Sequence, residues 1–229
     1  MARMGYSRGT AYRYVRELVE AGFLARAAGA AYTLGPRIIE LDYAIRKCDP
    51  VLSAGVPVMQ ALRKKLACDV LLTSFYEDRV VVTHHERGDD GITVSFSRGR
   101  VMPLFRGAPS KAILASLPTS KQKKIYREHT AEIAAAGLGP SWEEFKAILA
   151  GIRKREHCVS YAELDPGNVG VAVPLATEPA NTRSLALVFS RSRYDIVDKA
   201  LVLDVLRAAT KQIDLLAVQG DQGADKTRA

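Results

Sequence analysis

Hydrophobic positions near the start of the chain repeat with the period of a helix. Four apolar side chains share one face of this helix: Ala11, Val15, Leu18 and Val19. Ser7 is suited to cap the start of the helix, and Gly22 to end it in a left-handed conformation. Two short strands, 23–26 and 31–34, are expected next, on either side of a turn of small residues. A helix followed directly by a tight hairpin is typical of the second half of a winged helix-turn-helix.

The pattern then predicts two further helices and a hairpin. In 37–47 an apolar stripe is suited either to pair with a second copy of the chain or to pack on the hairpin before it. Asp49 and Pro50 suit the start of the next helix, which Pro57 should kink or break. The period changes to two in 70–76 and 79–85, which predicts a β-hairpin.

The remaining elements are a mixture of helices and strands. A strand and a turn are expected in 91–104, and helices in 120–128 and 141–154. Strands are predicted over 158–161, 169–175 and 184–189, followed by a long helix over about 195–218 and a polar tail over 220–229. The fold class is therefore α+β.

Composition excludes several classes of protein. The chain has 229 residues, 48% hydrophobic and 25% charged, which rules out disorder throughout. No apolar run approaches the roughly 20 residues that span a bilayer, and the N-terminus lacks the apolar core of a signal peptide. Three scattered cysteines are too few for a disulfide framework. These features favour a cytoplasmic protein with no membrane partner.

The net charge of +8 is concentrated at one end of the chain. Up to Arg37 there are six arginines, no lysine and only two acidic residues, Glu17 and Glu20. The arginine guanidinium is suited to bidentate contact with phosphates and guanine edges. On a basic helix beside a hairpin, this charge favours a nucleic-acid partner over a merely solvated face.

The N-terminal segments resemble the recognition helix and wing of the IclR family of bacterial transcriptional regulators. The resemblance rests on 8–15, 18–24 and 32–35. The family usually has Ser-Thr before its aromatic–Arg pair, whereas this chain has Gly9-Thr10 and so lacks one hydroxyl. The resemblance implies a set of DNA-contacting residues: Arg8, Gly9, Thr10, Tyr12, Arg13, Arg16 and Arg26.

The family also places a helix, a strand and a second helix before the recognition helix, and this chain begins too late to contain them. A mis-assigned start, a shortened chain or a degenerate head would each account for this. DNA binding is expected of the family and of a full-length protein. For the chain as given, only binding through its charge is expected.

Two later motifs extend the resemblance to the family's effector-binding domain. Residues 103–115 match a family pattern of Pro-Leu followed by a small-residue turn and Lys-Ala, with departures at Gly107 and Ser110. The spacing of Ser160, Glu163 and 170–174 resembles the family's C-terminal signature. Small residues before a helix start leave backbone N–H groups free for an anion, although the same residues also suit close packing at an ordinary junction. The resemblance implies a GAF-like antiparallel sheet domain with helices packed on it.

The resemblance implies an effector pocket beside this turn. Its expected residues are Leu72, Leu104, Arg106, Ala108, Pro109, Ser110, Tyr161, Gly170, Val188 and Ser190. Arg106 and the backbone amides of 110–112 favour a small carboxylic acid. The space at Gly170 beside Tyr161 favours an aromatic or extended acid. Alternatively, Tyr161 fills the cavity and Arg106 is solvated.

The expected organisation is a partial winged helix-turn-helix head (1–35), a linker helix (36–48), a GAF-like effector domain (49–219) and a tail (220–229). The expected function is that of a ligand-responsive transcriptional repressor, which binds a double-stranded DNA operator as a homodimer or homotetramer. The alternative is a stand-alone small-molecule sensor with a degenerate DNA-binding head.

Catalytic and metal sites have no support in the sequence. His157 and Cys158 are neighbours on a predicted strand and so point to opposite faces, as do His84 and His85. A metal site from these residues is compatible with the fold, but no recognised metal, phosphate-loop or nucleophile motif is present. We therefore expect no enzyme activity, no cofactor and no metal.

Overall fold

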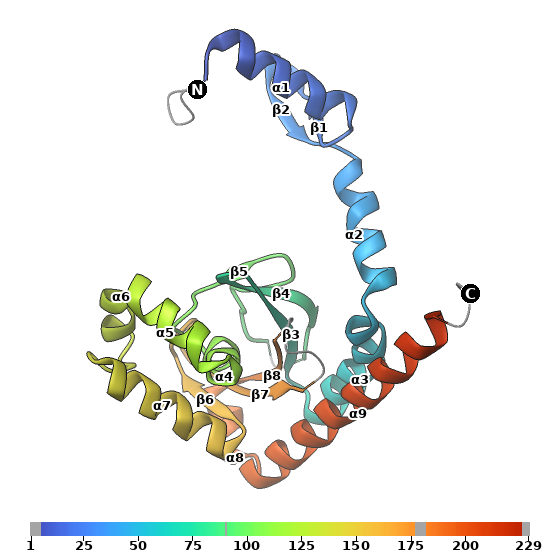
Figure 1. The fold of residues 1–229 in the computed structure, drawn as a ribbon. Helices are drawn as coiled ribbons and strands as arrows, with labels where there is room; N and C mark the ends of the chain where they lie inside the picture. The colour runs from blue at the N-terminus through green and yellow to red at the C-terminus, as the bar shows by residue number, and fades with distance from the viewer. Residues whose placement is uncertain (1–5, 90, 177–181, 226–229) are drawn as a thin grey trace. The chain divides into compact units, whose positions relative to one another are not determined.

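The computed structural model describes residues 6–89, 91–176 and 182–225 (Figure 1). The chain divides into two units, Met1–Asp49 and Pro50–Ala229. Within the described residues, no helix combines the length and the apolar character that crossing a membrane requires.

The first unit contains two helices and a two-stranded hairpin. Its elements are α1 (Arg8–Glu20), β1 (Leu24–Arg26), a 3-10 turn (Ala28–Ala30), β2 (Tyr32–Leu34) and α2 (Arg37–Cys48). The Ser7 hydroxyl accepts a hydrogen bond from the Thr10 amide at 3.3 Å, and Gly22 has φ of +76° after the end of α1. The predicted cap, stop and hairpin are therefore confirmed.

Side chains in the first unit are poorly buried. Over residues 6–49, Gly35 is the one buried residue. Ala11, Val15 and Val19 on the apolar face of α1 are half-buried, whereas Leu18 is 43% exposed. The unit is therefore held by local backbone hydrogen bonds and partial contacts, without a closed core.

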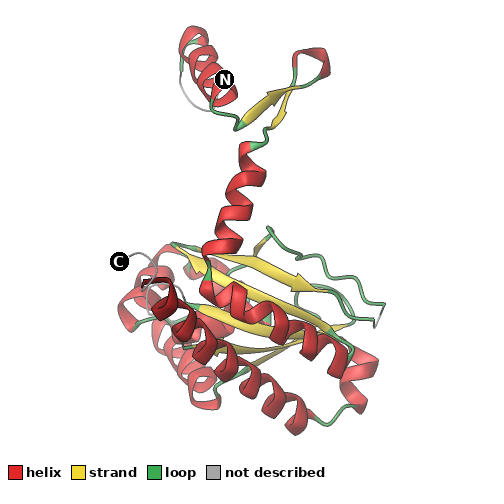
Figure 2. Cartoon of the chain, turned by 90° about the vertical axis from the view of Figure 1, so that its right-hand side faces the viewer, coloured by secondary structure: helices red, strands yellow, loops and turns green. Residues whose placement is uncertain are grey.

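The second unit is a six-stranded antiparallel sheet with helices on both faces (Figure 2). The strand order is β5-β4-β3-β8-β7-β6. Its elements are α3 (Pro50–Leu66), β3 (Asp69–Tyr76), β4 (Arg79–Glu86), β5 (Val101–Met102), α4 (Ala108–Ser116), α5 (Thr119–Glu128), α6 (Thr130–Ala135), α7 (Trp142–Arg155), β6 (Cys158–Tyr161), β7 (Asn168–Leu175), β8 (Arg183–Ser190), α8 (Arg191–Ile196) and α9 (Lys199–Asp225). The α+β fold and its antiparallel sheet are as expected.

Two hydrophobic cores lie on opposite faces of the sheet. One forms under α3 and α9 and includes Leu72. The other forms under α4 and α7 and includes Leu71 and Phe145. Neighbouring residues of β3 therefore enter different cores, because side chains alternate across a strand. The unit is therefore stabilised by buried side chains on both faces of the sheet.

Of the two effects expected of Pro57, a kink or a break, the break is wrong, since α3 runs without interruption from Pro50 to Leu66. An interior proline costs a helix about 3 kcal/mol. Val51 and Leu52 before Pro57, and Val58 and Met59 after it, are buried in the first core. Each such side chain contributes about 1.5–3 kcal/mol, so packing on both sides outweighs the lost hydrogen bond.

The helix predicted from 195 is divided in two. α8 ends at Ile196, and the Asp198 carboxylate accepts hydrogen bonds from the amides of Ala200 (2.9 Å) and Leu201 (3.2 Å), which start α9. α9 then runs to Asp225, into the segment expected to be a tail. The strand expected in 91–104 is limited to Val101–Met102, and α6 was not predicted.

Candidate functional site

The start of α4 is fixed over the middle of the sheet by buried hydroxyls. Ser184 on β8 donates a hydrogen bond to the Pro109 carbonyl at 3.2 Å. The Thr73 hydroxyl on β3 lies 2.7 Å from the Ser184 hydroxyl. Thr73 and Ser184 are both fully buried, so this short network holds the small-residue turn in place.

The polar donors of this turn are bound within the chain. The Gly107 amide donates to Glu163 Oε2 at 2.9 Å, and the Ala108 amide donates to Ser160 Oγ at 2.9 Å. Lys111 Nζ lies 2.5 Å from Glu163 Oε1. Pro109 has no amide hydrogen. The donors expected here were Arg106 and the amides of 110–112. The structure instead brings together the Gly107 amide and Lys111 Nζ, and both already hold the Glu163 carboxylate.

A small cavity of about 40 Å³ lies between the turn and the sheet. Its apolar walls are formed by Leu71, Val94, Phe96, Met102, Leu164 and Val188. The polar residues that reach it are Ser160, Glu163, Asp165 and Asn168. The volume is far below the roughly 300–1,000 Å³ of a ligand pocket, so this cavity is too small for an organic ligand in the present conformation.

Three of the expected effector residues line this cavity, namely Pro109, Gly170 and Val188. Ser160, Gly170 and Val188 are cross-strand neighbours on β6, β7 and β8, and so form one row. Ala108 borders the row, because its Cβ lies 3.6 Å from the position of a Cβ on Gly170. The turn and the sheet thus meet where expected.

Leu72, Tyr161 and Ser190 lie elsewhere, contrary to expectation. Leu72 belongs to the core under α3 and α9. Tyr161 is 49% exposed, and its ring packs against Tyr194 with a centroid distance of 5.9 Å. Ser190 caps α8 by accepting a hydrogen bond from the Arg193 amide. For Leu72 and Tyr161 the physical reason is strand alternation, because Leu71 and Ser160, one position away, face the cavity. Ser190 ends β8, where its side chain is used as the cap of α8.

Leu104, Arg106 and Ser110 are close to the turn but do not line the cavity. Arg106 is exposed, and Leu104 packs against the second core. Ser110, on the first turn of α4, is fully buried, and its hydroxyl has no hydrogen-bond partner among the described residues. Among the residues that sequence reasoning left out, Ser160 and Glu163 were visible in the C-terminal signature.

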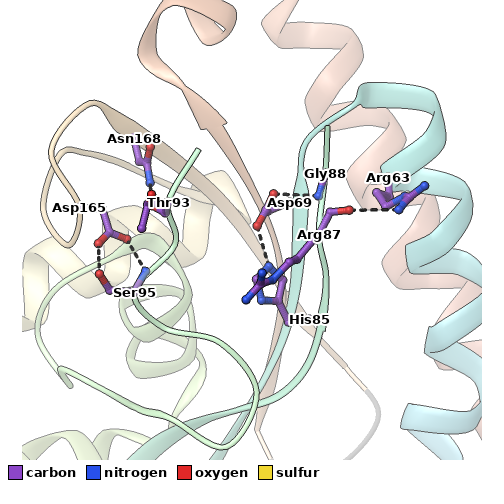
Figure 3. A network of polar contacts seen from close by, with 9 residues as sticks. All are labelled: Arg63, Asp69, His85, Arg87, Gly88, Thr93, Ser95, Asp165 and Asn168. Atoms are coloured by element: carbon purple, nitrogen blue, oxygen red, sulfur yellow. Dashed lines mark hydrogen bonds and ion pairs between the residues drawn. The ribbon is translucent and has the colours of Figure 1, made fainter. Parts of the chain in front are cut away.

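Two polar networks fix the segment that carries Val94 and Phe96 (Figure 3). At its far end, the Ser95 backbone amide and hydroxyl both donate to the Asp165 carboxylate, and the Asn168 side-chain amide donates to the Thr93 carbonyl at 2.9 Å. At its near end, the Gly88 amide donates to Asp69 Oδ1 at 2.8 Å. One wall of the cavity is thus tied to the loop between β6 and β7.

A larger hollow of about 650 Å³ lies between α4, α7, α9 and the end of β7. Its floor is apolar, with Ala115, Ile152 and Val173, and its rim carries Arg207 and Asp214. No sequence motif pointed to this hollow. It is large enough for a ligand, but it is separate from the row of residues under the α4 turn.

His84, His85 and the buried Cys158 are engaged in structural contacts. His85 Nε2 lies 2.6 Å from Asp69 Oδ2, and His84 Nε2 lies 2.7 Å from Glu86 Oε1. Burial raises the pKa of Cys158 to about 11, so its thiol stays protonated near neutral pH. In the part of the chain that the structure describes, no three His, Cys, Asp or Glu side chains gather as a metal site would need.

In the first unit, three of the expected DNA-contacting residues lie together. Tyr12 and Arg16 on α1 and Arg26 on β1 line a cleft of about 580 Å³. Arg16 is 80% exposed and pairs with Glu20 at 2.7 Å. Arg8, Gly9 and Arg13 are also exposed, whereas Thr10 is half-buried and 2.9 Å from the Ser7 hydroxyl. This surface is accessible and basic, which suits contact with phosphates.

Comparison with known proteins gives a consistent result. Residues 45–215 match the family model described as bacterial transcriptional regulator IclR C-terminal. The HTH-type transcriptional regulator KipR of Bacillus subtilis is 25% identical over 173 residues, which cover 75% of this chain and 68% of that protein.

Two solved structures have the same fold. An IclR transcriptional regulator from Alicyclobacillus acidocaldarius superposes with a TM-score of 0.75 and 21% identity, covering 94% of this chain and 88% of that one. An IclR homologue from Microbacterium hydrocarbonoxydans, in complex with 4-hydroxybenzoate, gives a TM-score of 0.76 and 17% identity, covering 95% and 89%.

Proposed function

The chain belongs to the IclR family of bacterial transcriptional regulators, and on that premise we propose that it is a DNA-binding repressor released or retained by a small carboxylic acid. The acid, aromatic or extended, binds beside the start of α4. The observation that carries the proposal is the turn itself, where the Gly107 amide and the Lys111 ammonium converge on one carboxylate. A site that holds one carboxylate is chemically suited to hold another.

The size of the acid follows from the apolar walls of the cavity. Leu71, Phe96 and Val188 offer contacts to a ring or an alkyl chain once the cavity opens. The 4-hydroxybenzoate bound by the Microbacterium homologue is an acid of this kind, and it supports an aromatic effector here.

The first unit supplies the DNA contacts in this proposal. Its exposed arginines, among them Arg8, Arg13 and Arg26, would neutralise operator phosphates and read base edges. The apolar side chains of α2 support assembly as a homodimer or homotetramer, since Ile38, Leu41 and Ile45 are 36%, 37% and 57% exposed. A symmetric dimer would match a palindromic operator.

The proposal is tested by ligand screening on the full chain. Thermal shift with aliphatic and aromatic carboxylates should give stabilisation that grows with concentration, reaching about 2.7 kcal/mol at a hundredfold excess over Kd. Operator affinity should then change by a factor of about 5–150 in the presence of the same acid. Stabilisation by no carboxylate at all would remove the acid from the proposal.

The second candidate is a small-molecule sensor without sequence-selective DNA binding. It is favoured by the absence of a closed core among residues 6–49. Fluorescence anisotropy separates the two: a sensor should bind operator and random duplex equally, and lose both between low and physiological salt. Operator selectivity at physiological salt would exclude it.

A further inference from the structure

The carboxylate of Glu163 stands where the effector's carboxylate is proposed to bind. Its two oxygens are shared between the Gly107 amide (2.9 Å) and Lys111 Nζ (2.5 Å). The Lys111 side chain is 11% exposed and that of Glu163 27%, so the ammonium is largely shielded from solvent while the carboxylate is partly exposed.

The cavity cannot admit an organic acid as it stands. Its volume of about 40 Å³ is several times smaller than the roughly 300 Å³ of the smallest ligand pockets. Leu164, the neighbour of Glu163, closes it over the turn: a Cβ on Gly107 would lie 2.6 Å from Leu164 Cδ1. Entry of a ligand therefore requires residues 163 and 164 to move.

Movement of the loop between β6 and β7 would also release the wall of the cavity that Val94 and Phe96 form. Asp165 and Asn168, at the end of the same loop, hold Ser95 and Thr93 (Figure 3). Val94 and Phe96, which alternate with these two residues, line the cavity. The loop between β6 and β7 and the segment around 93–96 are thus connected by hydrogen bonds, and one displacement opens both walls.

We infer that Glu163 is an internal competitor of the effector. The incoming carboxylate takes the Gly107 amide and the Lys111 ammonium from Glu163, which swings into solvent with Leu164 and loosens the hold of Asp165 on Ser95. This inference rests on the proposed function, because it assumes that a carboxylate binds at this turn.

The exchange defines the chemistry of the ligand. One carboxylate replaces another, so the number of charges and hydrogen bonds at the turn is conserved, and affinity depends on the apolar body that enters the enlarged cavity. A monoanionic acid with an aromatic or branched apolar body fits this requirement. A neutral amide of the same shape does not, because it cannot displace an ion-paired carboxylate.

The test is Glu163→Gln in the full chain, with 4-hydroxybenzoate as the probe and its amide as the neutral analogue. The glutamine keeps the volume and one acceptor for Gly107 but loses the charge that pairs with Lys111. Calorimetry should show binding of 4-hydroxybenzoate about tenfold tighter than in the unsubstituted protein, the scale of one charge-assisted hydrogen bond, and no gain for the amide. Glu156→Gln, on the rim of the larger hollow, is the matched control and should change nothing.

The outcomes separate this inference from the proposed function. If both proteins bind 4-hydroxybenzoate with equal affinity, or the variant binds it more weakly, Glu163 is a structural cap and the inference is overturned. If neither protein binds any carboxylate in a panel of acids, the proposed function is contradicted, and this inference, which rests on it, is contradicted as well.

Hydrogen exchange on the unsubstituted protein tests the same point without a variant, in case Glu163→Gln does not fold. With saturating 4-hydroxybenzoate, amides of 163–168 and 93–96 should exchange about tenfold faster or more, since both segments are released together. Slower exchange in both segments would show that the ligand enters without displacing them, and would overturn the inference.

Discussion

The two units of this chain are stabilised by different kinds of interaction. The second unit has a sheet with a packed core on each face, and residues such as Phe145, Phe189 and Leu206 are fully buried there. The first unit has good local signals, including a capped helix and a paired hairpin, but Tyr12, Ile39 and Leu34 are 61%, 74% and 70% exposed. Local propensity is thus satisfied in both units, whereas burial is achieved in only one.

This difference indicates where stability and function should depend on partners. A unit with a closed core can bind a ligand and transmit strain through packed side chains. A unit without one gains most of its order from what it contacts, such as DNA or a second copy of the chain. The predictions below test this contrast, beginning with the largest effect.

Removing a large side chain should lower the free energy of unfolding far more in the second unit than in the first. Phe145→Ala in the second core should lower the free energy of unfolding by about 3–5 kcal/mol, because it leaves a cavity that cannot collapse fully. Leu18→Ala on α1, where the side chain is 43% exposed, should change it by about 0.5 kcal/mol or less. Urea denaturation followed by circular dichroism measures both, and equal losses would mean that the first unit has a core of its own.

Narrowing the cavity should weaken the ligand response while the apo fold persists. A Cβ on Gly170 would lie 3.0 Å from Ser160 Oγ, so a small shift of that side chain admits it. Gly170→Ala should therefore place one methyl group in the apolar space beneath α4 and reduce the stabilisation of about 2.7 kcal/mol expected at a hundredfold ligand excess. Thermal shift with and without acid checks this. Loss of folding in the absence of ligand would instead identify Gly170 as a packing residue.

The buried Cys158 thiol should make the free energy of unfolding of the second unit depend on pH in the alkaline range. Burial raises the pKa of Cys158 from an ordinary value of 9.0 to about 11. Between these values the unfolded thiol loses its proton and the folded one keeps it, so stability present below pH 9 is lost as pH rises to about 11. The loss from this group is about 2 kcal/mol.

Comparison of variants isolates that contribution from other groups that titrate at high pH. The unfolding free energy of Cys158→Ala should fall less steeply between pH 9 and 11 than that of the unsubstituted chain. Cys48→Ala, which removes an exposed thiol from the first unit, should leave the slope unchanged. Parallel curves for all three proteins would contradict the assignment.

The smallest effect is expected at the basic surface of the first unit. Arg26→Ala should reduce the slope of log affinity against log salt for duplex DNA by about 0.9, the contribution of one phosphate contact. Between 50 and 200 mM salt this corresponds to about 0.7 kcal/mol. Lys146→Ala removes an exposed cation from the second unit and serves as the control. The same decrease in both variants would show that DNA does not distinguish the two units.

Most elements could be predicted from the sequence because their signals are local. The cap at Ser7, the stop at Gly22 and the change of period at 70 each depend on residues a few positions apart. The break between α8 and α9 was missed, although Asp198 is a normal N-cap residue, because the apolar pattern continues across it. The effect of Pro57 on the continuity of the helix was predicted to be too large, because a helix pattern does not show the tertiary packing on both sides of this residue.

The residues expected around the α4 turn come from segments that the structure brings together there, but not always from the face that meets the turn. β3 is buried on both sides from Asp69 to Phe75, so it has no polar–apolar alternation to show that Leu71 rather than Leu72 faces α4. The same one-residue shift separates Ser160 from Tyr161. That Glu163 occupies the turn was also beyond sequence reasoning, since the two segments lie 56 residues apart.

The pairing of β3 with β8 has a consequence for how the protein is made. Thr73 and Ser184 lie 111 residues apart, and β8 fills the gap between β3 and β7 in the middle of the sheet. During synthesis, β3 and β4 can form a hairpin early, but the inner edge of β3 stays unpaired until β8 has left the ribosome. Folding of this unit is therefore late and non-local, as high contact order dictates. The nascent chain carries an exposed, apolar strand edge for about half of its translation, from the end of β3 at Tyr76 to the end of β8 at Ser190, which favours binding by chaperones.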